Sequence, residues 1–231
     1  GSSVLVKNGS VSVKDFAGAI TVEGGRITSI DSPSSNVFVQ EDGAVGDILD
    51  ATNVTVVDGC KVGNVTVSGL VTLNDGTIES IEADGNVTLE GGVVTNDVKS
   101  KAVITTTSEE NDQNDDPLDT KIGGDVIARG SSAKVAIDNK SDDGEAAIRI
   151  GGNVIVRYAT ASANTVEIGS SDTTGSIQIG GAVEGEKILL GGNGLLSLTG
   201  VRASSEVDFD EDDGVVVESD LTFAGFNSVI G

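Results

Sequence analysis

The chain has 231 residues and a formal net charge of −23, with 37 acidic and 14 basic residues, no His, no Trp, no Met and a single Cys. This charge excludes nucleic acid as a partner, because a phosphate backbone must be neutralised by Lys and Arg, and it disfavours anionic membrane surfaces. Without His, Ser-His-Asp and Cys-His catalysis are excluded, and one Cys cannot supply a zinc site.

The composition predicts an all-β fold. Val and Ile abound, and 32 Gly stand beside only 2 Pro. β-branched residues favour strands and glycine favours tight corners. No run reaches the ~20 apolar residues of a membrane helix, so we expect no membrane insertion.

Apolar and polar residues alternate in short runs along the whole chain, which is typical of half-buried strands. The runs span three to five residues and end at Gly, Asn-Asp, Asp-Gly or Gly-Gly, which suit sharp turns. The pairs expected to face inward are Val4 and Val6, Val11 and Val13, Ile20 and Val22, Val37 and Val39, Val65 and Val67, Val71 and Leu73, Val87 and Leu89, Val135 and Ile137, Val166 and Ile168, Ile177 and Ile179, and Ile188 and Leu190.

Ile-Gly-Gly recurs at 122–124, 150–152 and 179–181, each time followed by a Val at the same offset. In the first half, 20–30 matches 71–81, and 87–95 is a partial copy. Units this short cannot bury their apolar side alone, so neighbouring units must stack. The sequence predicts a β-solenoid or stacked β-arches made of short strands with glycine corners; a β-sandwich or jelly roll is the alternative.

The glycine pairs lack the third glycine and the following helix of a nucleotide-binding loop, so we interpret them as corners. In the second copy, Val154 and Val156 are expected to face inward and Ile155 outward. An outward Ile predicts that the second side of this strand is also covered.

Segment 108–119, "SEENDQNDDPLD", breaks the alternation and is rich in acid. We interpret it as an acidic surface loop or linker between an N-terminal β-repeat half, 1–107, and a C-terminal half with 28–29-residue repeats, 120–231.

Calcium is the one metal for which the residue types are suitable, because it binds carboxylate oxygens. The first candidate set is Asp208, Asp210, Asp212 and Asp213, and a second is Asp112, Asn114, Asp115, Asp116 and Asp119. For both sets the alternative is a solvated acidic surface. No other cofactor is expected.

We do not expect an enzyme. Carboxylate pairs suit glycosidases, but one Tyr and no Trp make a sugar platform hard to build. A lyase of acidic polysaccharides would need a basic cleft, and the 14 basic residues are spread along the chain.

Two kinds of covalent modification are candidates. Cys60 is unpaired within the chain, which suggests an intermolecular disulfide or, alternatively, a small buried apolar side chain. Asn-x-Ser/Thr occurs at Asn8, Asn53, Asn64, Asn86 and Asn139, so these are candidate glycosylation sites.

Strand edges without proline, such as those expected at residues 3–13 and 221–231, invite pairing with another copy. We therefore expect a structural protein that self-assembles by strand-edge pairing into an extracellular sheath, filament or surface layer, its partner being copies of itself. The alternative is a virus or phage fibre, a decoration protein, or an adhesin that binds a glycan.

The alternating "NVTV", "VTLEGG" and "IGGNVIV" runs, the acidic loops and the lack of His, Met and Trp resemble the amyloid-like sheath proteins of chain-forming methanogenic archaea. The resemblance covers the whole chain. It implies a cell envelope of stacked hoops in which Cys60 could cross-link neighbours.

Overall fold

The computed structural model describes residues 2–7, 9–106, 119–130, 133–139, 141, 146–157, 165–170, 173–191, 196–209 and 215–217. Within these ranges the chain is all-β and has no helix. The strands are β1 (Ser3–Val6), β2 (Ser10–Lys14), β3 (Ala17–Glu23), β4 (Arg26–Asp31), β5 (Ser34–Gln40), β6 (Ala44–Asp50), β7 (Asn53–Val67), β8 (Val71–Ala83), β9 (Asn86–Glu90), β10 (Gly92–Val94), β11 (Val98–Ser100), β12 (Ala102–Thr106), β13 (Thr120–Ile122), β14 (Val126–Arg129), β15 (Lys134–Asp138), β16 (Ala147–Ile150), β17 (Val154–Arg157), β18 (Thr165–Ile168), β19 (Ser176–Leu190), β20 (Leu196–Phe209) and β21 (Val215–Val217).

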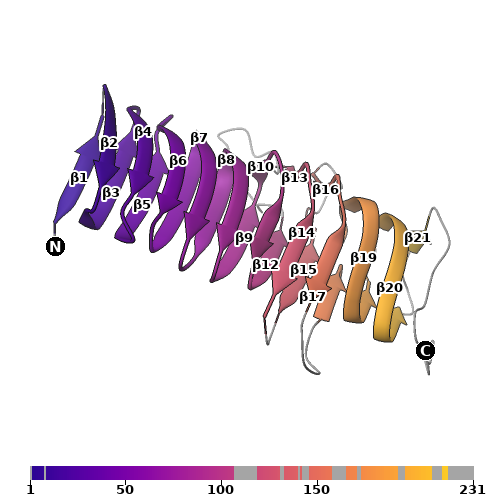
Figure 1. Ribbon diagram of the computed structural model, residues 1–231. Helices are drawn as coiled ribbons and strands as arrows, with labels where there is room; N and C mark the ends of the chain where they lie inside the picture. The colour runs from indigo at the N-terminus through magenta and orange to yellow at the C-terminus, as the bar shows by residue number, and fades with distance from the viewer. Residues whose placement is uncertain are drawn as a thin grey trace.

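Successive turns of the chain stack along one axis from the N-terminus to β21 (Figure 1). The strands pair in parallel with the turn before and the turn after, as β5 does with β3 and β7. Strands on the two sides of segment 107–118 also pair directly, β12 with β15 and β10 with β13. The stack therefore continues across the acidic segment.

Each turn adds one residue to each of three inward apolar rows, which define three faces. The first face runs Val4, Ile20, Val37, Val54, Val71, Val87, Val103, Val135, Val166, Ile188 and Val207. The second face runs Val11, Ile27, Val45, Val62, Ile78, Val94, Ile122, Ile150, Ile179 and Leu198. The third face runs Val13, Ile30, Ile48, Val65, Ile81, Val98, Val126, Val154, Val183 and Val201.

The register confirms the predicted repeat of the second half and corrects that of the first. Ile122, Ile150 and Ile179 are stacked partners, so one Ile-Gly-Gly copy is one turn. In the first half one turn takes only 16 or 17 residues, as the contacts of Ser80 with Asn64 and of Asn53 with Asn36 show. The match between 20–30 and 71–81 therefore skips two intervening turns, whose repeat the sequence reading missed.

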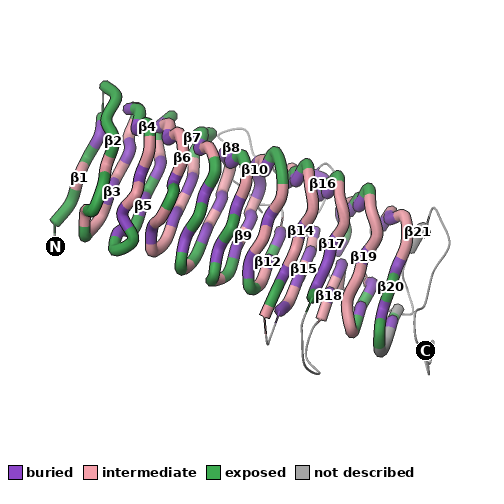
Figure 2. Tube along the Cα trace, viewed as in Figure 1, coloured by how far each residue is buried: buried purple, intermediate pink, exposed green. Residues whose placement is uncertain are grey.

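The alternation of buried and exposed residues is largely as predicted (Figure 2). Val11 is an exception, being 42% exposed, because nothing in the described chain lies on the outer side of the first turn. The prediction of uniformly short strands is wrong, since β7 and β19 each run for 15 residues around the corners. Ile155 is buried at 6% exposure, which agrees with a covered second side.

The three faces meet at three corners that differ in chemistry. The first corner joins the first face to the second, the second corner joins the second face to the third, and the third corner leads back to the first face. Examples in the turn containing β7 and β8 are Asp58 at the first corner, Asn64 at the second and Ser68 at the third.

Candidate assembly surfaces

The second corner is built from glycine and short polar side chains. Asp125 Oδ1 accepts hydrogen bonds from the Asn153 backbone N–H at 2.7 Å and from Asn153 Nδ2 at 3.1 Å. One turn earlier, Asp97 Oδ1 accepts from the Asp125 N–H, and one turn later Asn153 Oδ1 accepts from the Ala182 N–H. Each side chain thus satisfies backbone donors of the next turn, where the corner interrupts the strand ladder.

The same arrangement exists in the first half. Asp47 Oδ1 accepts from the backbone N–H and Nδ2 of Asn64, and Asn64 Oδ1 accepts from Ser80 Oγ. The signal was present in the sequence as "VGDI" at 45–48 and "VGNV" at 62–65, shorter relatives of "IGGNV".

Glycine is required at this corner because the turns approach each other closely. A Cβ at Gly123 would lie 2.0 Å from the Thr95 carbonyl oxygen, and one at Gly152 would lie 2.3 Å from Asp125 Oδ1. Gly123 and Gly124, and Gly151 and Gly152, lie in bends between strands, whereas Gly180 and Gly181 lie within β19 at a register shift.

The third corner carries three basic side chains in consecutive turns. Arg129 pairs in register with Arg157, and Lys101 follows Ser100, whose partner Ala128 precedes Arg129. All three residues are exposed. Sequence reasoning missed this row because 28 residues separate its members, and it wrongly treated the basic residues as dispersed.

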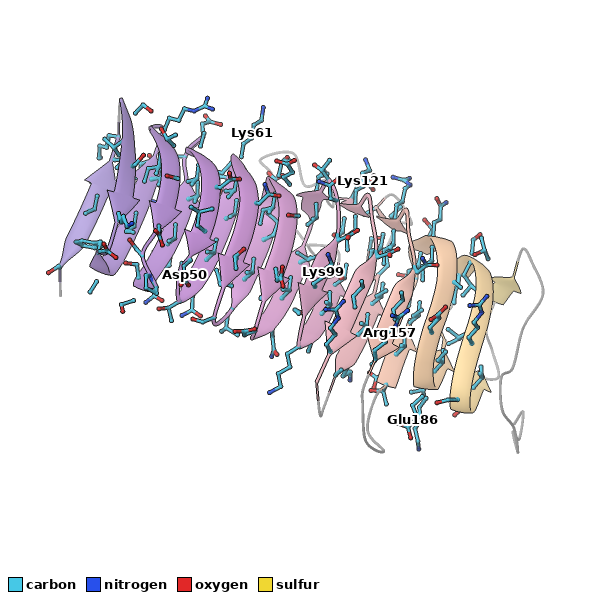
Figure 3. All side chains as sticks on the ribbon, viewed as in Figure 1. Asp50, Lys61, Lys99, Lys121, Arg157 and Glu186 are labelled. Carbon is cyan, nitrogen blue, oxygen red and sulfur yellow. The ribbon has the colours of Figure 1, made fainter. Side chains whose placement is uncertain are left out.

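The environment of this basic row is only partly acidic. Lys99, Lys101 and Arg129 line a hollow of about 360 Å³ together with Glu82 and Asp84. Figure 3 places Arg157 on the lower half of the stack and Glu186 at its lower margin, whereas Lys61 and Lys121, beside the first corner, lie at the upper margin.

The first corner is acidic. Its described turns carry Glu23, Glu41, Asp42, Asp58, Asp75 and Glu90. Glu41, Asp42, Asp58 and Asp75 have φ between 50° and 60°, a left-handed conformation that Asp tolerates better than most residues. The acidic sequence segments 107–118, 142–145 and 210–214 also join a first-face strand to a second-face strand.

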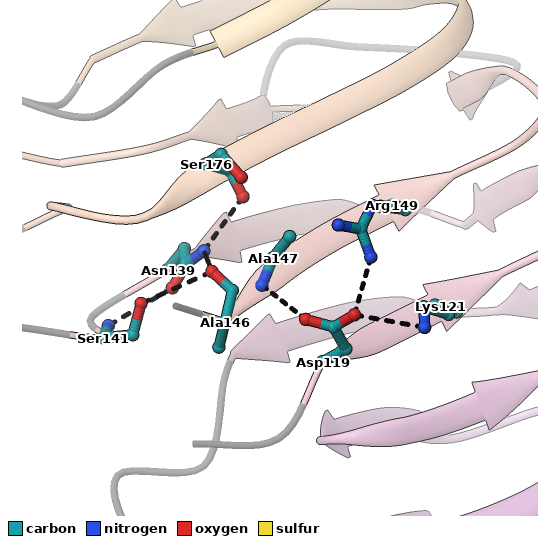
Figure 4. Close-up of polar contacts among 8 residues, drawn as sticks. All are labelled: Asp119, Lys121, Asn139, Ser141, Ala146, Ala147, Arg149 and Ser176. Atoms are coloured by element: carbon teal, nitrogen blue, oxygen red, sulfur yellow. Dashed lines mark hydrogen bonds and ion pairs between the residues drawn. The ribbon is translucent and has the colours of Figure 1, made fainter. Parts of the chain in front are cut away.

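The carboxylate of Asp119, a member of the second calcium set, already binds other groups of the protein (Figure 4). Its Oδ1 accepts from the Ala147 N–H at 2.8 Å, and its Oδ2 lies 2.6 Å from Arg149 Nη1 and 3.1 Å from Lys121 Nζ. Burial alone would raise the pKa of the Asp119 carboxyl, but Ala147, Lys121 and Arg149 together hold it below its ordinary value.

The first calcium set lies mostly outside the described residues. Asp208 is exposed on β20, and Asp210, Asp212 and Asp213 are not described. Of the second set, Asp112, Asn114, Asp115 and Asp116 are likewise outside the described ranges. Over the ranges that are described, no group of three or more Cys, Asp or Glu side chains could hold a metal ion.

Cys60 is buried in β7 at 1% exposure, and its thiol lies 3.9 Å from the Asp58 carbonyl oxygen. Burial is the largest influence on this thiol and raises its pKa, although hydrogen bonding to the Gly43 backbone opposes the rise. The position favours the alternative of a small buried side chain, because a disulfide with another copy would need the corner at Asp58 and Gly59 to open.

The five glycosylation candidates have different environments. Asn139 is fully buried, and its Nδ2 donates to the carbonyl oxygens of Ala146 and Ser176, both at 2.9 Å (Figure 4). A glycan has no room there, so this candidate fails on burial. The Asn64 amide is used by the second corner and the Asn53 amide bonds to Asn36. Asn86 is exposed with a free amide, and Asn8 is outside the described residues.

The end of the stack at the N-terminus presents unpaired strand edges. Within the described chain β1 pairs only with β3, and β2 only with β4. Leu5 on β1 is 52% exposed and Val11 on β2 is 42% exposed. Unpaired backbone beside exposed apolar side chains is the usual feature of a strand that accepts a partner.

None of the described segments is a helix long and apolar enough to cross a membrane. Comparison of the chain with family models, with curated proteins and with solved structures finds no match in any of the three.

Proposed function

We propose that the protein is a β-solenoid building block that stacks end to end, by strand-edge pairing between copies, into an extracellular sheath, filament or surface layer. The observation that carries the proposal is the first turn, whose strands β1 and β2 pair on one side only. A second copy that continues the three apolar rows would cover Val11, which is 42% exposed at the end of the second row.

The regularity of the rows supports this assembly. Val4 starts the first row and Val11 the second, and each row continues through every described turn with a single apolar residue at each step. A copy added in the same register would extend a parallel ladder about 4.8 Å at a time, as in cross-β material. The resemblance to amyloid-like archaeal sheath proteins is consistent with such a polymer.

The test is electron microscopy of the purified chain together with two variants of the first turn, Leu5→Pro and Ser10→Pro. Proline removes a ladder donor and blocks an edge. Losing one hydrogen bond of ~1 kcal/mol should weaken each end contact roughly fivefold. We expect filaments or tubes from the wild-type chain and a shift to monomers in both variants.

Circular dichroism checks that the variants keep their β structure, since the first turn is covered by the rest of the stack on one side only. A wild-type chain that stays monomeric at all concentrations, or that binds a sugar as a monomer or trimer, contradicts the proposal. That second result would favour the fibre or adhesin alternative.

A further inference from the structure

The basic edge (Lys101, Arg129 and Arg157) is an unbalanced feature of a strongly acidic protein. Its three cations lie in consecutive turns, about 4.8 Å apart along the axis. Like charges directly opposite each other on neighbouring strands repel. Such a row is tolerated in isolation only at some cost in stability, and an anionic partner would remove that cost.

The protein itself does not neutralise this edge within the described chain. Lys99 is bound by Asp97 at 3.4 Å, and Arg157 reaches Glu184 only at 3.9 Å. Lys101 and Arg129 form no ion pair with any described residue, even though Glu82 and Asp84 line the same hollow. Segments 131–132 and 158–164, which follow Arg129 and Arg157 in sequence, contain no charged residue.

A matching anionic row exists on the same molecule, at a different corner. The acidic edge (Glu41, Asp42, Asp58, Asp75 and Glu90) has at least one carboxylate in each of four consecutive turns of the first half, whereas Glu23, one turn earlier, is bound by Lys7 at 3.1 Å. Both edges take their axial spacing from the same strand ladder, so their charges repeat at the same interval. The two edges lie at different corners of the stack, so one copy cannot bring them together.

We propose that the basic edge binds the acidic edge of a second copy and so joins neighbouring stacks side by side. The proposal rests on the proposed function, since it names the lateral contact of the same assembly. The two edges are different surfaces, so the contact is heterologous and leaves one edge of each kind free on every pair. Lateral growth then continues and gives a sheet or wall instead of a closed dimer.

The experiment measures association in solution by sedimentation velocity, at ~0.02 M and ~0.5 M salt, because screening over a few Å abolishes contacts between exposed charges. Two charge-reversal variants are used, Lys101→Glu with Arg129→Glu on the basic edge, and Glu41→Lys with Glu90→Lys on the acidic edge. The matched control for the first is Lys101→Arg with Arg129→Lys, which keeps the charge of the same two exposed residues.

At low salt we expect wild-type and control chains to associate, and each reversed variant to associate at least ~10-fold more weakly, as the loss of a few charge pairs implies. The chain with both edges reversed should regain association, which a merely misfolded variant would not. High salt should abolish the lateral association of all of them and leave end-to-end stacking in place.

Two results would overturn the proposal. One is a basic-edge variant that associates as strongly as the wild type. The other is a wild-type chain that stays monomeric at low salt yet binds a linear polyuronate through Lys101 and Arg129, which would assign the edge to an acidic polymer.

Microscopy separates this proposal from the proposed function. If the basic-edge variant forms single filaments that no longer lie side by side, the result supports both the end-to-end stacking and the lateral contact. Salt-sensitive lateral association without any filament supports only the lateral contact.

Discussion

Asn153 binds the Asp125 carboxylate one turn below it through both its backbone N–H and its side-chain amide, at 2.7 and 3.1 Å. The two turns approach this closely because Gly124 and Gly152 occupy the preceding position. The spacing of the glycines, the hydrogen bonds of Asp125 and Asn153 and the close approach of the turns therefore all depend on the second corner.

Replacing Gly152 by Ala should destabilise the fold by roughly 2–3 kcal/mol, the cost of overpacking, since the new Cβ would lie 2.3 Å from Asp125 Oδ1. Chemical unfolding measures the loss. Gly59→Ala is the control: Gly59 has φ of 69° but nothing within 4 Å of the added Cβ, so only the ~1 kcal/mol of a left-handed backbone is expected. Equal effects at the two positions would contradict the crowding argument.

Thr105→Val should stabilise the protein by about 1 kcal/mol. Thr105 stacks between Leu89 and Ile137 in an apolar row, and its buried hydroxyl has no hydrogen-bond partner among the described residues. Thr120→Val is the opposite case, because Thr120 Oγ1 donates to the Thr106 carbonyl oxygen and accepts from the Gly91 N–H. It should cost about 1–3 kcal/mol. Thermal unfolding of the two variants should therefore shift in opposite directions.

Asn139→Ala should cost about 2–4 kcal/mol, because it removes the amide donor of the Ala146 and Ser176 carbonyl oxygens in a buried site and leaves Ala146 with only the 3.4 Å bond from Ser141 Oγ. The same change at Asn86, an exposed asparagine in the same type of sequence motif, should stay within ~0.5 kcal/mol. Urea titration compares the two. A neutral Asn139→Ala would show that its network contributes little to the fold.

Acid should destabilise the wild-type protein partly through Asp119. The pKa of this carboxyl is lowered from its ordinary 3.8 in the folded chain, so its contribution is present above pH 3.8 and is lost as the pH falls through the lower folded value. Asp119→Asn should reduce the loss of stability over that interval. Unfolding free energies measured from pH 5 down to about pH 2 test this, and identical pH profiles would contradict it.

The Cys60 thiol should react slowly with iodoacetamide in the folded protein and at least ~10-fold faster once the chain is unfolded, because reaction requires local opening. The raised pKa of this thiol also predicts a pH dependence of stability. The contribution of the buried, protonated thiol is present below the unfolded pKa, near 8.5, and is lost as the pH rises through the folded value. Cys60→Ala should remove this alkaline loss. Rapid labelling of the folded chain would instead support an accessible, cross-linking thiol.

The sequence predicts the core better than it predicts the surface. Strict alternation around Val54 and Val56, or Val166 and Ile168, identifies inward residues because a strand has a side-chain period of two. The glycine corners are found for the same reason, since they interrupt that period. The prediction that Val11 is buried fails, because alternation does not show which turn lies at the end of the stack.

The charged edges could be predicted from the sequence only in part. Arg129 and Arg157 stand at the same offset from their Ile-Gly-Gly copies, so the 28-residue spacing already aligns them, as the register does. Lys101 precedes the first copy, and the acidic edge lies in turns of 16 or 17 residues, so neither could be found from that spacing. A mixture of turns with 16, 17, 28 and 29 residues conceals which side chains share an edge.

The second corner has a consequence for how this chain can change over time. In the described turns after the first, two or three residues separate its flanking core positions, as from Val62 to Val65 and from Ile150 to Val154, whereas the connections at the first corner differ widely in length. Insertions, deletions and foreign peptides should therefore be tolerated at the first corner and rejected at the second. The second corner therefore fixes the distance between successive turns, whereas the first corner can accept new sequence.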